Sequence, residues 1–156
     1  MLFSENIYKF MFAALQEAEL ALEQNEVPVG AVIVHKDRII GKGFNQTETL
    51  KDPTAHAEMI AITSAANHLQ DWRLNDCDIF VTLEPCIMCT GALLSARIKT
   101  IYFSTFDRKF GACGSLYNLA EEKKYNHKIQ IFSGIYSSES EALLKKFFVN
   151  VRYNKN

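Results

Sequence analysis

The chain has 156 residues, of which 48% are hydrophobic and 22% charged, and its formal net charge is −1. This length and composition fit a single domain, residues 1–156, that can bury a core without disulfides. No apolar run approaches the roughly 20 residues that a membrane-spanning helix needs. The net charge does not favour nucleic-acid binding, because such proteins usually carry a basic surplus, so any such binding must use a local patch.

The hydrophobic pattern divides the chain into alternating helices and strands. In chain order it predicts a helix at 4–25, strands at 27–34 and 39–44, a helix at 53–68, a strand at 79–83, a helix at 86–97, a strand at 99–104, a short helix at 116–124, a strand at 128–132 and a helix at 138–152. Polar or glycine-containing loops are expected at 45–51 and 105–115.

The N-terminal elements predict a helix followed by a hairpin. Ser4 is a candidate helix cap, and apolar residues follow it at helical spacing from Ile7 to Leu22. The next apolar run is typical of a buried strand, and the polar residues 36–38 predict a turn into a second strand. We therefore expect these two strands to pair in antiparallel fashion.

The element order α-β-β-α-β-α-β-α-β-α predicts an α/β fold. A helix between the last two strands implies a parallel crossover, because a tight hairpin joins only antiparallel strands. The order fits a three-layer α-β-α architecture, with a five-stranded mixed sheet and helices on both faces.

The types and spacing of His56, Cys86 and Cys89 predict a catalytic zinc site. A histidine and two cysteines supply ligands that Zn²⁺ prefers, and three protein ligands leave one tetrahedral position for water. The two cysteines are three residues apart, so they share a helix face, and a helix N-terminus favours the thiolates that metal binding requires. We expect one zinc ion per chain.

Glu58, two residues after His56, is the candidate catalytic residue. Its carboxylate is free to take a proton from the metal-bound water instead of ligating the metal. Within a helix the two side chains would diverge by about 200°, so both must sit at a helix start. Asp52-Pro53 predicts that start as a cap followed by a first-turn proline, and Pro85 predicts another before Cys86.

A redox role or a purely structural role fits these residues less well. A Cys-x-x-Cys pair can be a redox motif, and a lone histidine is usually an ordinary core or surface residue. A redox pair does not need a His-x-Glu at another helix start, however, and the joint pattern is a zinc-deaminase signature. Cys77 and Cys113 remain, and we expect both to be packing thiols. Because no secretory segment is found at the N-terminus, we expect a reducing, cytoplasmic location.

Further segments accompany the metal motifs, namely Glu26-Val27-Pro28-Val29-Gly30-Ala31-Val32, Gly43-Phe44-Asn45, Thr82-Leu83-Glu84-Pro85-Cys86, Gly111-Ala112-Cys113-Gly114-Ser115-Leu116, Asn126-His127 and Phe147-Phe148. With them the sequence resembles, nearly end to end, the bacterial tRNA adenosine deaminases of the cytidine-deaminase-like zinc deaminases. The metal motifs identify only the superfamily, and the glycine loop, Asn126-His127 and the last helix point to the tRNA branch.

The resemblance implies roles for residues outside the metal motif. In that family the position matching Asn45 holds the target base, and those matching Asp107 and Asn126 meet the anticodon nucleotides around it. From the residues alone, Asn45 is more simply a loop-capping asparagine. Lys109 and Arg152 are candidate phosphate contacts, although each fits a solvated surface charge as well. The resemblance also implies a homodimer that binds a tRNA anticodon stem-loop in a shared cleft.

Three functions compete for this motif. The resemblance favours hydrolytic deamination of adenosine to inosine at the wobble position of a tRNA anticodon, with Glu58 moving the protons. A zinc deaminase of a free base or nucleotide, such as guanine or deoxycytidylate, would use the same zinc site. A zinc-bound RNA-binding module without catalysis is disfavoured by the intact Glu58.

Overall fold

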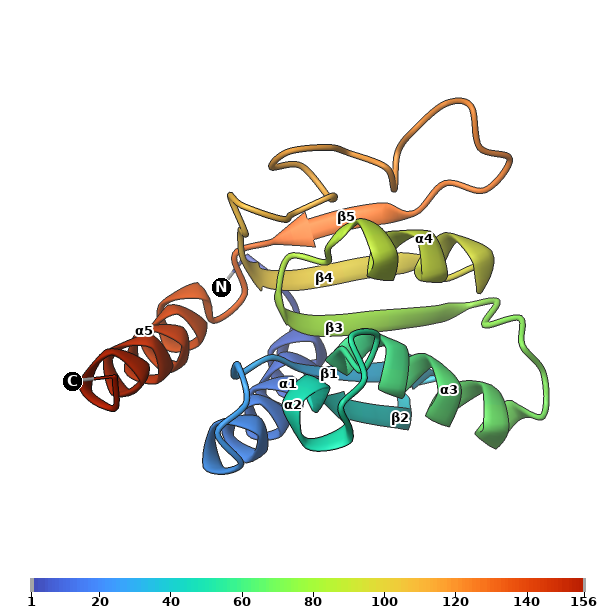
Figure 1. The fold of residues 1–156 in the computed structure, drawn as a ribbon. Coiled ribbons are helices and arrows are strands. Elements are labelled where there is room, and N and C mark those ends of the chain that lie inside the picture. The colour runs from blue at the N-terminus through green and yellow to red at the C-terminus, as the bar shows by residue number, and fades with distance from the viewer. Residues whose placement is uncertain (1, 156) are drawn as a thin grey trace.

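The computed structural model describes residues 2–155, which form five helices and one five-stranded sheet (Figure 1). The elements are α1 (Glu5–Glu23), β1 (Gly30–His35), β2 (Arg38–Phe44), α2 (Thr47–Leu50), α3 (Ala57–Leu69), β3 (Cys77–Leu83), α4 (Ile87–Ser95), β4 (Thr100–Thr105), β5 (Gln130–Ser133) and α5 (Ser137–Tyr153). The strand order is β2-β1-β3-β4-β5. The predicted α/β fold with a mixed five-stranded sheet is confirmed.

The strand directions bring several chain segments to one edge of the sheet. β1 is antiparallel to both β2 and β3, whereas β3, β4 and β5 are mutually parallel. β2, β3 and β4 therefore run in the same direction, and their last residues, Phe44, Leu83 and Thr105, lie at a common edge. We term this edge the carboxyl edge, and segments that follow these strands meet there.

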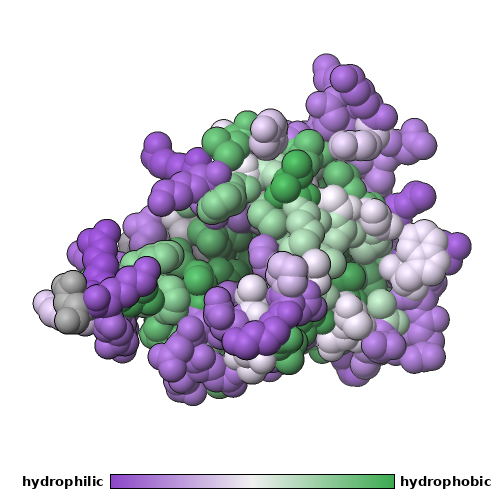
Figure 2. Space-filling view, viewed as in Figure 1, coloured by the Kyte–Doolittle hydropathy of each residue, from purple (hydrophilic) through white to green (hydrophobic). Residues whose placement is uncertain are grey.

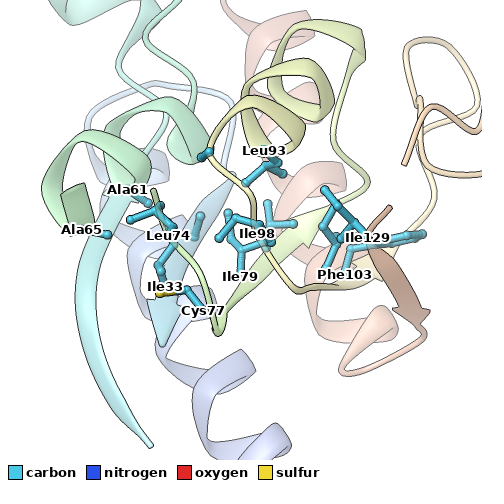
Figure 3. Close-up of a cluster of buried hydrophobic side chains, with 14 of the residues drawn as sticks. Ile33, Ala61, Ala65, Leu74, Cys77, Ile79, Leu93, Ile98, Phe103 and Ile129 are labelled. Atoms are coloured by element: carbon cyan, nitrogen blue, oxygen red, sulfur yellow. The ribbon is translucent and has the colours of Figure 1, made fainter. Parts of the chain in front are cut away.

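Helices cover both faces of the sheet because successive strand residues point to opposite sides. Ile33, Ile79 and Phe103 belong to the buried cluster under α3 and α4, where Figure 3 shows them near Ala61, Ala65 and Leu93. Val32 and Phe80 belong to a second cluster with α1 on the other face. Of the helices within residues 2–155, none has both the length and the apolar character needed to cross a membrane.

Three sequence predictions about helices differ from the structure, at 116–124, at 45–51 and at the start of the metal-site helix. Residues 116–124 form turns instead of a helix, because the N–H groups of Leu116 and Leu119 bond to the carbonyls of Gly111 and Ala112. The crossover from β4 to β5 is parallel, as expected, but irregular. The expected loop at 45–51 contains the short helix α2.

The metal-site helix also begins later than predicted. α3 starts at Ala57, not at Pro53, and its N-cap is His56. Asp52 instead closes a local turn, since its Oδ1 accepts hydrogen bonds from the backbone N–H and hydroxyl of Thr54 at 2.8 and 2.7 Å. An aspartate favours such turns as readily as helix caps.

Candidate active site

The starts of α3 and α4 lie together at the carboxyl edge. α3 packs against β2, and Gly43 of β2 permits the close approach, because a Cβ there would lie 2.3 Å from the carbonyl oxygen of Ala57. α4 follows β3 after a three-residue connection that contains Pro85 and Cys86. The two helix N-termini thus meet where β2 and β3 end.

His56 and Glu58 satisfy the geometric condition set by their spacing. His56 is the N-cap of α3, with an extended backbone (φ −75°, ψ 154°), and its carbonyl accepts the first helical hydrogen bond from the N–H of Ile60 at 3.1 Å. Because His56 is not helical, its side chain does not follow the rotation that would separate it from Glu58. Glu58 is in the first turn and only 4% exposed.

Cys86 and Cys89 occupy the equivalent start of α4. Cys86 is the N-cap (φ −75°, ψ 178°), and its carbonyl accepts a hydrogen bond from the N–H of Thr90 at 2.9 Å. Cys89 lies in the first turn and is fully buried. The partial positive charge of the helix N-terminus favours thiolates at both positions.

The three predicted ligands converge at distances that fit a zinc ion. Nδ1 of His56 lies 3.6 Å from Sγ of Cys86 and 3.5 Å from Sγ of Cys89, and the three ligand atoms lie within 4.8 Å of one another. Tetrahedral bonds of about 2.3 Å to sulfur and 2.0 Å to nitrogen would separate those atoms by roughly 3.5 Å. The donor set and its spacing therefore suit zinc, and within residues 2–155 no further His, Cys, Asp or Glu joins the group.

The protonation equilibria around this group are strongly coupled. The pKa of Cys86 is lowered to about 4, chiefly by its hydrogen bond with Cys89 and further by His56, while the pKa of Cys89 is raised by the same hydrogen bond and by burial. The hydrogen bond with Cys86 raises the pKa of His56. One thiolate is thus already favoured without a cation, and a bound cation would favour the second.

Glu58 is suited to exchange protons near neutral pH. Burial is the main reason that its pKa is raised to about 7, and the nearby Cys86 thiolate adds to the shift. A carboxyl group with that pKa can both accept and release a proton at physiological pH. This is the property that a general acid-base needs.

The remaining cysteines lie outside this group. Burial raises the pKa of Cys77 to about 11 and that of Cys113 to about 12. All four cysteines are free thiols. Cys77 and Cys113 are packing residues in the core, as expected.

Similarity to known proteins identifies the family. Residues 4–105 match the model of the cytidine and deoxycytidylate deaminase zinc-binding region. The tRNA-specific adenosine deaminase of Aquifex aeolicus is 46% identical over 145 residues, which cover 93% of this chain and 95% of that protein. The chain belongs to the tRNA-specific adenosine deaminase family.

Solved structures of deaminases agree with this assignment. One from a study of A-to-I editing by tRNA deaminases at the wobble position matches with a TM-score of 0.84 at 42% identity, covering 87% of this deaminase and 99% of the other chain. The guanine deaminase of Bacillus subtilis matches with a TM-score of 0.60 at 38% identity, but covers only 63% of each chain. Of these two structures, the tRNA-editing one matches over the larger part of both chains.

Asn45 lies where β2 of this deaminase ends, and it does cap its own loop. Its Oδ1 accepts hydrogen bonds from the hydroxyl and N–H of Thr47 at 2.7 and 3.3 Å, and its Nδ2 donates to the carbonyl of Val27 at 3.3 Å. The residue is 9% exposed. Because an amide nitrogen carries two hydrogens, one N–H is left, among the contacts of residues 2–155, to donate to a ligand.

Asp107 and Lys109 lie in one turn after β4. Oδ1 of Asp107 accepts hydrogen bonds from the N–H groups of Lys109 and Phe110 at 3.1 and 3.2 Å. Cys86 pairs with Gly111 in an isolated β-bridge, which brings this turn to the start of α4. Asp107 is half-buried and Lys109 is exposed, and the turn that carries both candidates adjoins the start of α4.

Asn126 and Arg152 are placed differently. Asn126 is exposed in the irregular crossover, and the next residue, His127, is tied by its Nε2 to the carbonyl of Ile98 at 2.6 Å. Ile98 precedes β4, so Asn126 lies at the far end of the parallel strands, a strand length of about 20 Å from the carboxyl edge. One chain therefore does not bring Asn126 to the metal group.

Arg152 is exposed in the last turn of α5. This helix begins at the carboxyl edge, where the hydroxyl of Ser140 donates to the carbonyl of Thr82 and the hydroxyl of Thr105 donates to Glu141. From there α5 projects away from the sheet (Figure 1). Arg152 thus lies at the end of an arm that starts at the carboxyl edge.

Sequence reasoning missed two buried carboxylates, Glu26 and Glu84, which are 1% and 2% exposed. Oε1 and Oε2 of Glu26 accept hydrogen bonds from the N–H groups of Glu48 and Thr49 at 3.0 and 2.8 Å, which fixes α2. Burial alone would raise the pKa of Glu26, but these N–H groups lower it below its ordinary value. In the sequence, each of these acids stands next to an apolar run that predicts a buried strand. A charged residue at such a position needs hydrogen-bond partners, and this requirement was the signal that could have identified them.

Proposed function

We propose that this chain is a zinc-dependent hydrolase that converts adenosine to inosine at the wobble position of a tRNA anticodon. One observation carries the proposal: a His-Cys-Cys group of zinc-like geometry lies beside a buried glutamate in a chain that matches a tRNA-specific adenosine deaminase over 93% of its length. Because tRNAs read codons in the cytoplasm, the cytoplasmic location expected from the sequence is part of this proposal.

The residues of the chain divide the chemistry between them. His56 through Nδ1, with the thiolates of Cys86 and Cys89, would hold the zinc ion, which supplies Lewis-acid activation of the attacking water. Glu58 accepts a proton from that water and delivers protons to adenine N1 and to the departing amino group. The products are inosine and ammonia.

The loops at the carboxyl edge would bind the extruded nucleotide and its neighbours. The second N–H of Asn45 Nδ2 can donate to a ring nitrogen of the base, and the free oxygen of Asp107 can accept from a ribose 2′-hydroxyl, which only RNA offers. Lys109 and Arg152 would contact phosphates. Unstacking a base takes less free energy in an anticodon loop than in a duplex, so a loop substrate suits a small domain.

The homodimer belongs to the same proposal. Ile87, Phe110, Leu116 and Tyr117 are exposed around the start of α4, and the N–H of Leu116 bonds to the carbonyl of Gly111, next to Cys86. Figure 2 shows hydrophobic and neutral surface over α4. A second copy seated on this patch would bury it, and Asn126 would meet the anticodon loop from the partner subunit.

Sedimentation tests the dimer. Wild-type protein should sediment as a dimer at micromolar concentration, and Leu116→Asp, at a side chain 53% exposed in the patch, should shift it to monomer. Leu20→Asp is the matched control, because Leu20 is 40% exposed on α1 and remote from the patch. A wild-type monomer would contradict the proposal.

The substrate test compares four molecules. Purified protein is given an RNA stem-loop with adenosine at the wobble position, the same loop in DNA, free guanine and deoxycytidylate, and both ammonia and inosine are measured. We expect turnover of the RNA, because binding energy from the whole loop is used to position the base. Equal or faster turnover of guanine or deoxycytidylate would assign the chain to small-molecule deamination.

A further inference from the structure

Glu84 is a buried carboxylate whose four hydrogen bonds all come from one segment of the chain. Its Oε1 accepts from the N–H of Asp107 at 3.1 Å and from the hydroxyl of Ser115. Its Oε2 accepts from the N–H groups of Cys113 and Ser115, both at 3.0 Å. These donors bracket residues 107–115, which we term the 107–115 segment.

The same segment is attached to the start of α4. The N–H of Ala112 bonds to the carbonyl of Pro85 at 2.9 Å, and Gly111 pairs with Cys86. Glu84 directly precedes Pro85, and its own N–H bonds to the carbonyl of Thr105 at 2.9 Å. The carboxylate therefore joins the end of β3, the end of β4 and the turn that carries Asp107 and Lys109.

Apart from the buried Ala112 and Cys113 and the contacts with the start of α4, this segment depends on Glu84 to hold it in place. The segment contains no helix or strand. Phe110 within it and Leu116 directly after it are exposed and do not pack in the core. A carboxylate that accepts several backbone N–H bonds is a strong and directional anchor. A glutamine could not replace it, because its amide nitrogen would face an N–H donor where Glu84 has an oxygen.

We propose that Glu84 is a positioning residue that holds the 107–115 segment against the start of α4 and thereby sets how tightly the RNA substrate binds. The inference deepens the proposed function and rests on it, since it takes Asp107 and Lys109 as RNA contacts. In this proposal Glu84 contacts neither the base nor the donor atoms of the zinc ligands, because its carboxylate bonds to residues 107–115. It acts through the backbone of the segment.

The test uses the full chain with Glu84→Gln, and with Ser115→Ala as a milder variant that removes one of the four donors. Zinc content, hydrogen exchange at the amides of Asp107, Cys113 and Ser115, and kcat and KM on the RNA stem-loop are measured. In Glu84→Gln we expect about one zinc per chain, exchange and KM each raised about tenfold, and kcat within about threefold of wild type. Ser115→Ala should show a smaller rise in KM.

Val34→Ala is the control for general destabilisation. Val34 is buried in the core on the α1 face, away from the segment. Val34→Ala should have a lower melting temperature than the wild type and an unchanged KM. If Glu84→Gln behaves in the same way, with KM unchanged, the proposal is overturned and Glu84 serves stability alone.

Failure of the variant to fold and failure of the wild type to act on RNA lead to different conclusions. If Glu84→Gln does not fold, Ser115→Ala decides, and a wild-type KM in that variant overturns the proposal. If the wild-type chain does not deaminate the RNA, the proposed function fails and the RNA part of this inference fails with it. An active wild type with an unchanged KM in Glu84→Gln refutes only the inference.

Discussion

Two kinds of structure present side chains at the carboxyl edge, and they differ in how they are held. His56, Glu58, Cys86 and Cys89 sit at helix starts, fixed by helical hydrogen bonds and by packing against β2 and β3. Asn45 and Asp107 sit in loops fixed by side-chain hydrogen bonds, several of them to the buried acids Glu26 and Glu84.

The difference matches the two tasks of the proposed function. Metal ligation and proton transfer tolerate errors of only about 0.5 Å, so they belong on regular elements. Substrate contacts can change with the loops that carry them, while the scaffold stays the same. Substitutions at helix starts should therefore abolish the chemistry, whereas substitutions in the loops should alter stability and binding by smaller amounts.

The largest effect is expected at the helix start of α4. Cys86→Ala removes a ligand, so zinc should fall below about a tenth of an ion per chain and inosine formation should stop. Elemental analysis and the RNA assay measure both. Cys77→Ala, which removes a buried thiol outside the group, should keep its zinc, and a full zinc content in Cys86→Ala would contradict the assignment.

At the helix start of α3, Glu58→Gln should separate metal binding from turnover. Its zinc content should stay near one per chain, because Glu58 is not assigned as a ligand. Loss of a general acid-base typically lowers the rate by 10² to 10⁴, and single-turnover assays should show a fall in kcat of that order. Activity within tenfold of wild type would rule out the role.

In the loops, Gly111→Ala should destabilise the fold although it substitutes none of the proposed zinc ligands. A Cβ at Gly111 would lie 2.2 Å from Oε2 of Glu84, and such overpacking typically costs about 1–3 kcal/mol. Urea denaturation measures the change. Gly91→Ala on α4 is the control, since a Cβ there meets nothing within 4 Å, and equal losses in both variants would argue against the clash.

The smallest effect is expected for Glu26, which holds the loop after β2, and it should depend on pH. The folded-state pKa of Glu26 lies below its ordinary value, so its contribution is present at neutral pH and is lost as the pH falls through that lowered pKa. Glu26→Gln should therefore be about 1 kcal/mol less stable at pH 7, and the difference should shrink in acid. Denaturation at several pH values measures this.

Glu17 provides a control of opposite sign. Burial raises its pKa, with Lys42 opposing the shift, so the charged form of Glu17 is disfavoured in the folded chain. Glu17→Gln should keep or raise the stability at pH 7. A stability difference for Glu26→Gln that grew as the pH fell would contradict the assigned direction.

Much of the carboxyl edge could be predicted from the sequence because the chemistry demands particular residues at particular spacings. His56, Cys86 and Cys89 converge as their spacing indicated. The caps could not be located as well, because an aspartate before proline can close a turn or start a helix, and Asp52 does the former. Local patterns do not distinguish these outcomes.

The error at 116–124 has a different cause. This stretch contains good helix formers, including Leu119, Ala120 and Glu121, but propensity is a weak prior that tertiary contacts override. The N–H of Leu119 bonds to Ala112 and the carbonyl of Ala120 accepts from Ile129, which commits the backbone to non-local partners. Glu84 was missed for the same reason, since its partners lie 23–31 residues away.

The ligands are also divided between two parts of the chain, because His56 and Cys86 are 30 positions apart. His56 follows the hairpin of β1 and β2, whereas the cysteines lie at the start of α4, between the parallel strands β3 and β4. The unfolded chain does not hold these groups together, so zinc would bind the folded state and stabilise it by mass action. In a cell starved of zinc, a larger share of this protein would unfold and be degraded, so its abundance would fall together with its activity.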